Sequence, residues 1–308
     1  GVPVCAVLRI FMATASETTP RLGDDDVAAI DRLRTINARL KQELARVIIG
    51  QEETVERLTI CMFARGHSLL MGVPGLAKTL LVSKLAECVS LRFSRIQFTP
   101  DLMPMDITGT DILQETPEGR REFHFVPGPV FANIVLADEI NRAPPKTQAA
   151  MLEAMQEYKV TVVGKTSRLD PPFFVLATQN PVEQEGTYPL PEAQLDRFMF
   201  NLYVDYPSDV ELKTIIRNTT AGGLDTPESV LTGDDVLELR KAVRQVPISD
   251  HVLEYIVRLV SATHPNKETS PEITRKYLAW GAGPRAGQYL ALGAKSRALF
   301  RGNPQATA

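Results

Sequence analysis

The sequence predicts an α/β fold with a mainly parallel sheet, followed by a smaller all-helical domain. Short apolar runs alternate with helical patterns through the first two thirds of the chain, and this alternation is typical of a parallel sheet covered by helices. After Pro207 only helical patterns follow. The apolar runs that predict strands are HSLLMG, SRIQF, NIVLADE and FFVLATQN.

Residues 1–22 are expected to form a disordered leader. Their short apolar run lacks a basic N-terminal region and is broken by Arg9, which argues against a secretory signal peptide. An alternative is that the residues before Met12 lie upstream of a natural start. From Asp24 a long amphipathic helix is predicted, because apolar residues recur at steps of three and four. These residues are Val27, Ile30, Leu33, Ile36, Leu40, Leu44 and Val47, and a second helical pattern runs through Val55, Leu58 and Met62.

The predicted domain boundary lies near Tyr206–Ser208. It divides a core at residues 23–206 from a helical domain at residues 207–308. Several of the helical patterns in the second domain begin at Ser, Thr or Asp, which are favourable N-cap residues. The patterns are SDVELKTIIRNTT, TGDDVLELRKAVRQV, SDHVLEYIVRLVSA and PRAGQYLALGAKSRALF.

Composition excludes several classes of protein. The 308 residues include 34 Lys and Arg against 37 Asp and Glu, and this slight acidity argues against a nucleic-acid partner. The 3 cysteines form no CxxC pair, so neither a disulfide scaffold nor a zinc ribbon is expected, and a reducing, cytoplasmic location is favoured. No stretch approaches the roughly 20 apolar residues that a membrane span requires.

The segment GVPGLAKT lies between an apolar run and a helical pattern and predicts a phosphate-binding loop. Gly72 and Gly75 would let the main chain approach phosphates, Lys78 would reach the outer phosphates, and the Thr79 hydroxyl would bind Mg²⁺. Ala77 stands where the usual pattern has a second glycine, and it fits only if its φ stays below zero. The alternative is an ordinary glycine-rich turn. The expected nucleotide-binding residues are Gly72, Val73, Pro74, Gly75, Leu76, Ala77, Lys78, Thr79 and Leu80.

Two further strand ends carry polar residues that suit the same site. The apolar run Ile134–Ala137 ends in Asp138 and Glu139, and ligands bind at this edge of open α/β sheets. Asp138 is placed to hold Mg²⁺, and Glu139 to orient the attacking water. Asn180, at the tip of the next predicted strand, would contact the γ-phosphate or that water; the alternative for Asn180 is a turn residue.

Taken together, these segments resemble the MoxR group of AAA+ ATPases. The resemblance runs from about Ile48 to Phe198 and continues more weakly beyond. It implies an AAA+ αβα P-loop core with a small helical lid, ATP and ADP as ligands, Mg²⁺, and a homo-oligomeric ring that is usually hexameric. The segments that carry it are GVPGLAKT, FTPDLMPMDITGT, GPVFANIVLADEINRAPPKTQAAMLEAMQE and LATQNPVEQEGTYPLPEAQLDRF.

The resemblance also implies roles for individual residues. It places Walker A at Gly72–Thr79, Walker B at Asp138–Glu139 and sensor 1 at Asn180. It assigns an arginine finger to Arg197 and sensor 2 to Arg285. Gly283 stands where the family often has Ser, but proline at the first helical turn still lets the sensor 2 residue project from a helix start.

Further family features map onto this sequence. Ile48 and Ile49 would pack on the adenine base, and Gly50 would turn the chain beside it. One insertion, within about residues 107–126, would interrupt the helix that is numbered 2 in the family's core. A second insertion would form a hairpin near residues 159–170. In family members the lid usually ends in a strand and a helix. No pattern for this portion is found after residues 301–304.

Arg142, directly after Walker B, has two interpretations: a nucleotide sensor across a subunit boundary, or a residue that pairs locally. The function implied for the whole chain is Mg²⁺-dependent ATP hydrolysis by a ring ATPase, coupled to chaperone-like remodelling or maturation of a client protein. By the resemblance, the client would often contain a von Willebrand factor A domain or a metal centre. Two alternatives are the ATPase subunit of a metal-chelatase-type complex and a nucleotide-gated scaffold with little turnover. Glu139, Asn180 and Arg197 argue against the scaffold.

Overall fold

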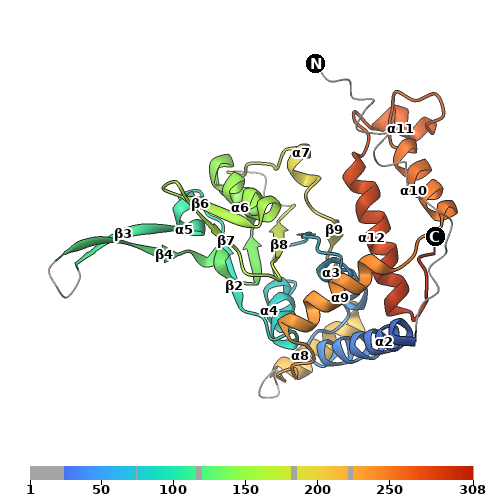
Figure 1. The fold of residues 1–308 in the computed structure, drawn as a ribbon, viewed down its shortest axis with the longest axis horizontal. Coiled ribbons are helices and arrows are strands. Elements are labelled where there is room, and N and C mark those ends of the chain that lie inside the picture. The colour runs from blue at the N-terminus through green and yellow to red at the C-terminus, as the bar shows by residue number, and fades with distance from the viewer. Residues whose placement is uncertain (1–23, 74, 116–119, 182–185, 221–224, 308) are drawn as a thin grey trace.

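The structure is a computed structural model that describes residues 24–73, 75–115, 120–181, 186–220 and 225–307 (Figure 1). The leader expected at residues 1–22 lies outside the described residues, and so does Pro74 of the phosphate loop. Among the described helices, none is both long and apolar enough to cross a bilayer.

A five-stranded parallel sheet forms the centre of the molecule. Its strand order is β2-β5-β8-β1-β9. The four strands expected from apolar runs are confirmed, whereas β9 at the edge was not predicted. Among its four residues only Leu202 is buried, and such a strand gives a weaker signal than a fully apolar run. The strands are β1 (Ser68–Met71), β2 (Phe93–Gln97), β5 (Ile134–Asp138), β8 (Phe174–Gln179) and β9 (Phe200–Tyr203).

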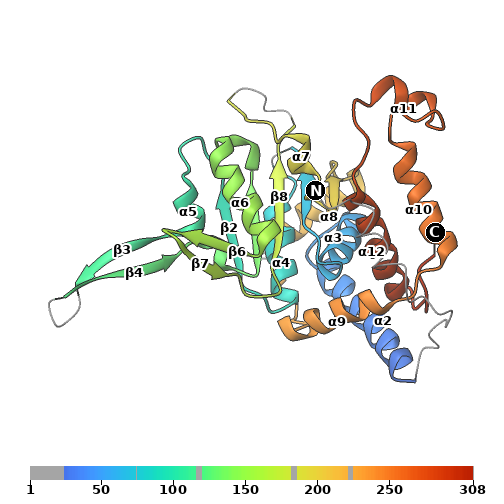
Figure 2. The ribbon, with the colours of Figure 1, turned by 45° about the horizontal axis from the view of Figure 1, so that its top comes forward.

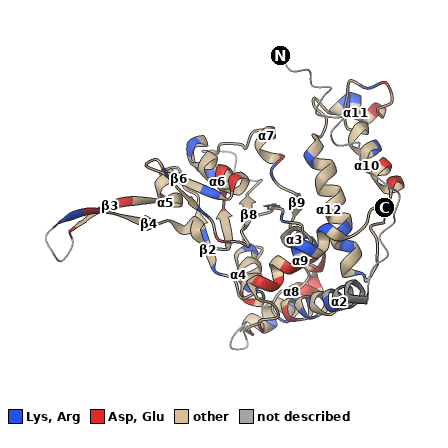
Figure 3. Ribbon diagram, viewed as in Figure 1, with Lys and Arg blue, Asp and Glu red and all other residues tan. Residues whose placement is uncertain are grey.

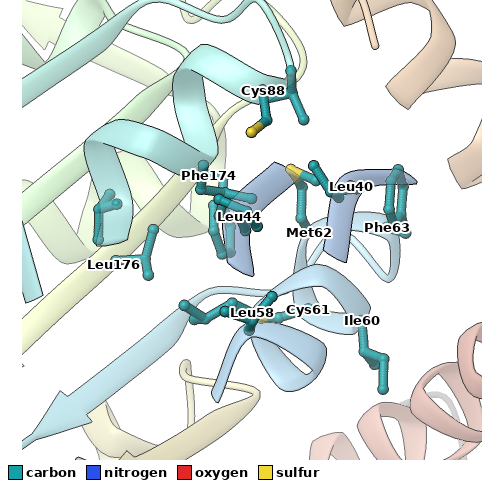
Figure 4. Close-up of a cluster of buried hydrophobic side chains, with 14 of the residues drawn as sticks. Leu40, Leu44, Leu58, Ile60, Cys61, Met62, Phe63, Cys88, Phe174 and Leu176 are labelled. Atoms are coloured by element: carbon teal, nitrogen blue, oxygen red, sulfur yellow. The ribbon is translucent and has the colours of Figure 1, made fainter. Parts of the chain in front are cut away.

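Helices cover both faces of this sheet, because successive strand residues point to opposite sides. Ile134 and Leu136 of β5 pack with α2 (Asp24–Ala45), α3 (Glu52–Phe63) and α4 (Lys78–Cys88) in one buried cluster. Figure 4 shows part of this cluster, including Leu40 and Leu44 of α2. The alternate residues Val135 and Ala137 pack against α6 (Pro145–Glu157) on the other face. The result is the αβα arrangement that the family resemblance implies.

The helices after Pro207 confirm the predicted helical patterns, and α11 is an additional short helix. Helices α9 and α12 contribute Val236, Leu239 and Phe300 to the same buried cluster as α2, α3 and α4. The rings of Phe63 and Phe300 meet edge to face, with centroids 5.6 Å apart. These helices therefore share a hydrophobic core with the sheet, and the division near Tyr206–Ser208 stays a prediction. The helices are α8 (Asp209–Thr220), α9 (Gly233–Gln245), α10 (Asp250–Ala262), α11 (Glu272–Tyr277) and α12 (Pro284–Phe300).

Both expected insertions take the form of antiparallel hairpins. Strands β3 (Gly109–Glu115) and β4 (Arg121–Pro127) follow the short helix α5 (Pro104–Thr108) and project far from the body (Figures 1 and 2). Their distal part carries charges of both signs (Figure 3). The second hairpin joins β6 (Lys159–Val162) to β7 (Lys165–Arg168) through Val163 and Gly164. Both turn residues have positive φ, 48° and 77°, as a type I′ turn requires.

Candidate nucleotide site

The phosphate loop joins the end of β1 to the start of α4 at the carboxyl edge of the sheet. Because β1, β5 and β8 are parallel neighbours, their carboxyl ends meet at this edge, where the N-terminus of α4 also favours anions. A cavity of about 430 Å³ opens there. It brings together five of the predicted loop residues with both Walker B residues and sensor 1. The residues lining it are Gly75, Ala77, Lys78, Thr79, Leu80, Arg95, Gln97, Asp138, Glu139 and Asn180.

Ala77 corrects one expectation. Its φ is +54° rather than negative, so it lies in the left-handed region immediately before α4. The loop must turn sharply there to direct its N–H groups toward the cavity, and a residue with a Cβ pays roughly 1–2 kcal/mol for that conformation. Ala77 is thus a strained substitute for the usual glycine.

A second cavity, of about 630 Å³, lies along the other side of the loop. Ile48, Ile49 and Gly50 line it, as the resemblance implies for a base pocket. It shares Gly75, Ala77 and Leu80 with the phosphate cavity, so the two form one path along the loop.

The segment beside the base cavity is fixed to the loop by a side-chain contact. Gln51 Nε2 donates to the Leu76 carbonyl oxygen at 3.2 Å. Gly50 has a φ of +74°, which a residue with a side chain would adopt only with strain. The first helix beyond the predicted domain boundary, α8, completes the cavity with Leu212, Ile215 and Asn218. The sequence did not mark these three residues, because they come from the segment assigned to a separate domain.

Both carboxylate oxygens of Asp138 are hydrogen-bonded. Oδ1 accepts the Thr178 hydroxyl at 2.6 Å. Oδ2 accepts two N–H groups of Arg95, from Nε at 3.0 Å and from Nη2 at 2.7 Å. The Thr178 oxygen in turn accepts the backbone N–H of Glu139 at 2.8 Å, so one hydroxyl on β8 orients both acidic residues.

The Glu139 carboxylate is held from two directions. Its Oε2 accepts Gln97 Nε2 at 2.9 Å and lies 3.0 Å from Arg142 Nε. This contact corresponds to the local interpretation of Arg142. Glu139 itself has a φ of +56°, which turns the chain immediately after β5 and aims the carboxylate into the cavity.

Arg95 and Gln97 were not singled out from the sequence. The available signal is their spacing on β2: residues two apart point to the same face of a strand, and Gln97 is its last residue. Their partners lie more than forty residues away, at a separation of 43 for Arg95 and Asp138 and 42 for Gln97 and Glu139. Only the pairing of β2 with β5 brings them together.

The structure does not bring Arg197 or Arg285 to the nucleotide cavities of their own chain. Arg197 Nη1 donates to the Leu152 carbonyl oxygen at 2.7 Å, and Arg285 Nη1 lies 3.3 Å from Asp196 Oδ2. Tyr289 O–H also donates to the Arg197 carbonyl oxygen at 3.1 Å. The start of α12 is therefore fixed beside α7 (Glu192–Leu195), and neither arginine lines the two cavities. The nucleotide-binding role expected for Arg285 stays a prediction.

Comparison with known proteins places this site in a family. Residues 67–200 match the family described as "ATPase family associated with various cellular activities (AAA)". The chain is 46% identical over 262 residues to "Chaperone MoxR1" of Mycobacterium tuberculosis, covering 84% of this chain and 68% of that protein. It is 30% identical over 300 residues to "Protein MoxR" of Methylorubrum extorquens, covering 92% and 85%.

A solved structure shows the same architecture. A crystal structure of a protein from Cytophaga hutchinsonii superimposes with a TM-score of 0.84 at 43% identity, covering 91% of this chain and 84% of that one. The phosphate loop, the acidic pair and these matches agree, and the chain is an ATP-hydrolysing member of the MoxR family of AAA+ ATPases.

Proposed function

We propose that the protein hydrolyses ATP with Mg²⁺ as one subunit of a head-to-tail ring of six subunits, and that hydrolysis remodels or matures a client protein. The observation that carries this proposal is the position of Arg197 outside the cavities of its own chain.

The residues around the phosphate cavity fit a bound Mg²⁺. Thr79 and Asp138 line the same cavity, and hydroxyl and carboxylate oxygens are the ligands that Mg²⁺ prefers. When bound with ATP, Mg²⁺ would neutralise charge on the phosphate oxygens. Lys78 would contact the outer phosphates, Glu139 would orient the attacking water, and Asn180 would contact the γ-phosphate or that water.

The position of Arg197 supports the proposed ring. In a head-to-tail ring one surface of a subunit meets a different surface of its neighbour, so Arg197 can complete the neighbour's phosphate site. A guanidinium suits this role because it stays charged and bonds phosphate oxygens in a planar fork. Arg285, which pairs with the adjacent Asp196, lies on the same side of the molecule. We therefore assign both arginines to the neighbouring site.

The β3–β4 hairpin supports a client-directed function. Leu113 and Phe123 face each other across it and are 54% and 70% exposed. Exposed apolar side chains on a projecting element are suited to contact another protein. A relative named as a chaperone supports the same role. A client with a von Willebrand factor A domain is the partner that the family resemblance implies.

Neither alternative function gains support from a specific contact. A metal-chelatase-type complex requires a dedicated partner, and a scaffold with little turnover disagrees with membership of an ATPase family.

A cytoplasmic location is proposed from the cysteine usage. Cys61 and Cys88 are buried free thiols, as expected in a reducing compartment.

Mixing two inactive variants tests the ring. Arg197→Ala should bind ATP almost normally but hydrolyse it roughly 10³–10⁵ times more slowly. Adding Lys78→Ala subunits should restore part of the activity, since some interfaces then pair an intact loop with an intact finger. Arg258→Ala, at an exposed position of α10, is the matched control and should retain full activity. Confirmed co-assembly without rescue at any mixing ratio would remove Arg197 from this role.

Client capture is tested separately. Glu139→Gln should keep the protein in its ATP-bound state, so an affinity pull-down with this variant should retain a client that contains a von Willebrand factor A domain. Lys78→Ala, which should bind ATP much more weakly, is the control. Equal recovery with both variants would contradict ATP-dependent client binding.

A further inference from the structure

Asp138 is the residue to which the proposed function assigns Mg²⁺, yet its carboxylate already contacts a cation of its own chain. Two N–H groups of the Arg95 guanidinium reach the same oxygen, Oδ2, at 3.0 and 2.7 Å. A carboxylate oxygen has two lone pairs, and both are then engaged. A water molecule bound to a divalent cation requires an acceptor of the same kind.

The two sides of the carboxylate differ in how firmly their partners are fixed. Thr178, which donates to Oδ1, is buried in the central strand β8 and also bonds the backbone of Glu139. Arg95 belongs to β2, an edge strand, and its side chain is 48% exposed. Asp138 is only 12% exposed. Arg95 is therefore the partner that can exchange, whereas Thr178 fixes the carboxylate in place.

We propose that Arg95 competes with a hydrated divalent cation for Oδ2 of Asp138 and so sets the Mg²⁺ concentration that nucleotide binding requires. This inference rests on the proposed Mg²⁺-dependent function. It makes Arg95 a positioning residue that acts through Asp138. Arg95 Nη2 also donates to Gln97 Oε1 at 2.6 Å, and Gln97 bonds Glu139, so the arginine contacts the networks of both acidic residues.

The test is a titration with MgCl₂. Binding of a fluorescent ADP analogue at a fixed concentration is followed while MgCl₂ is varied, and the midpoint is compared between the parent protein and Arg95→Gln. An ion pair that is half exposed is worth up to about 1 kcal/mol, so the midpoint should fall by roughly twofold to fivefold. Arg95→Lys keeps the charge but loses the two-point contact, and its midpoint should lie between the other two.

Two further variants separate competition from a structural effect. Arg92 directly precedes β2 and pairs with Asp170 at 2.9 Å, outside the cavity. Arg92→Gln should therefore leave the midpoint unchanged. In the Asp138→Asn background, Arg95→Gln should no longer shift the midpoint, since the shared oxygen has lost its charge. A shift that persists there would mean that Arg95 does not act through Asp138.

The outcomes distinguish this inference from the proposed function. A parent protein whose ADP binding does not respond to MgCl₂ would overturn the Mg²⁺-dependent function itself. A parent that responds, with Arg95→Gln unchanged or requiring more MgCl₂, would overturn only the competition. The thermal midpoint of each variant, measured alongside, establishes that the proteins compared are folded.

Discussion

Lys78 Nζ lies 2.6 Å from the carbonyl oxygen of Gly72, so the lysine at the start of α4 reaches back across the phosphate loop to the end of β1. Burial lowers the pKa of Lys78, while the nearby carboxylates of Asp138 and Glu139 oppose that effect. The ammonium group thus stands between the loop and the acidic pair, where the outer phosphates of ATP are expected.

Replacing Lys78 by alanine should weaken ATP binding. Hydrogen bonds to charged groups contribute about 1.5–3 kcal/mol, which corresponds to a loss of roughly tenfold to a hundredfold in affinity. Titration with a fluorescent ATP analogue measures the effect. Lys84→Ala on the same helix is the matched control, because Lys84 pairs with Glu87 outside the cavity. Unchanged affinity in Lys78→Ala would contradict the phosphate-loop assignment.

Glu139→Gln should separate binding from chemistry. The amide keeps the shape of the side chain but cannot accept a proton from water, so ATP should still bind while turnover falls by roughly 10²–10⁴-fold. Phosphate release and equilibrium binding are measured on the same preparation. Glu238→Gln, at an exposed position of α9, should behave like the parent. Turnover of Glu139→Gln within a factor of two of the parent would exclude Glu139 as the catalytic carboxylate.

Ala77→Gly should stabilise the protein. Glycine adopts a φ of +54° without the strain that alanine carries, and this gain exceeds the greater entropy of glycine in the unfolded chain. We expect the free energy of unfolding in urea to rise by roughly 0.5–1 kcal/mol. Ala86→Gly, inside the same helix, should instead lower it by about 1 kcal/mol or more. A loss of stability in Ala77→Gly would show that the left-handed conformation is not strained.

His67 should make the protein less stable in mild acid. Its Nδ1 accepts the Val175 N–H at 3.0 Å, its Nε2 donates to the Met155 carbonyl oxygen at 3.1 Å, and burial lowers its pKa to about 4. The unfolded chain, with an ordinary histidine pKa near 6.5, then binds more protons than the folded chain between these values. This contribution to stability is complete above pH ~6.5 and is lost as the pH falls toward 4, by roughly 3 kcal/mol in all.

Urea unfolding at a series of pH values measures this loss. His67→Gln should be less stable overall, because the two hydrogen bonds are disturbed, but its free energy of unfolding should change little between pH ~6.5 and ~4.5. His251→Gln, at an exposed position of α10, should keep the full pH dependence of the parent. A parent protein equally stable at both ends of that range would show that His67 titrates alike in both states.

Much of the site could be predicted because its parts are local in sequence. The phosphate loop between a strand and a helix, and the acidic pair after a strand, are short patterns whose spacing reports their geometry. Parallel strands then place Lys78, Asp138 and Asn180 around one cavity. The four apolar runs and the amphipathic helices were recognisable for the same reason, since periodicity is a local property.

The contacts that complete the site depend on packing between distant segments, and no local pattern encodes them. Arg95 meets Asp138 because β2 pairs with β5 in one register, in which Gln97 lies opposite Asp138. Arg285 lies beside Asp196 because α12 is packed into the core shared with the sheet. The sequence by itself determined the loop, the acidic pair and the strands, because each arises within a few residues. Only the tertiary structure decided which side chains reach those groups, because burial of the helices and strand register position side chains that are far apart in the chain.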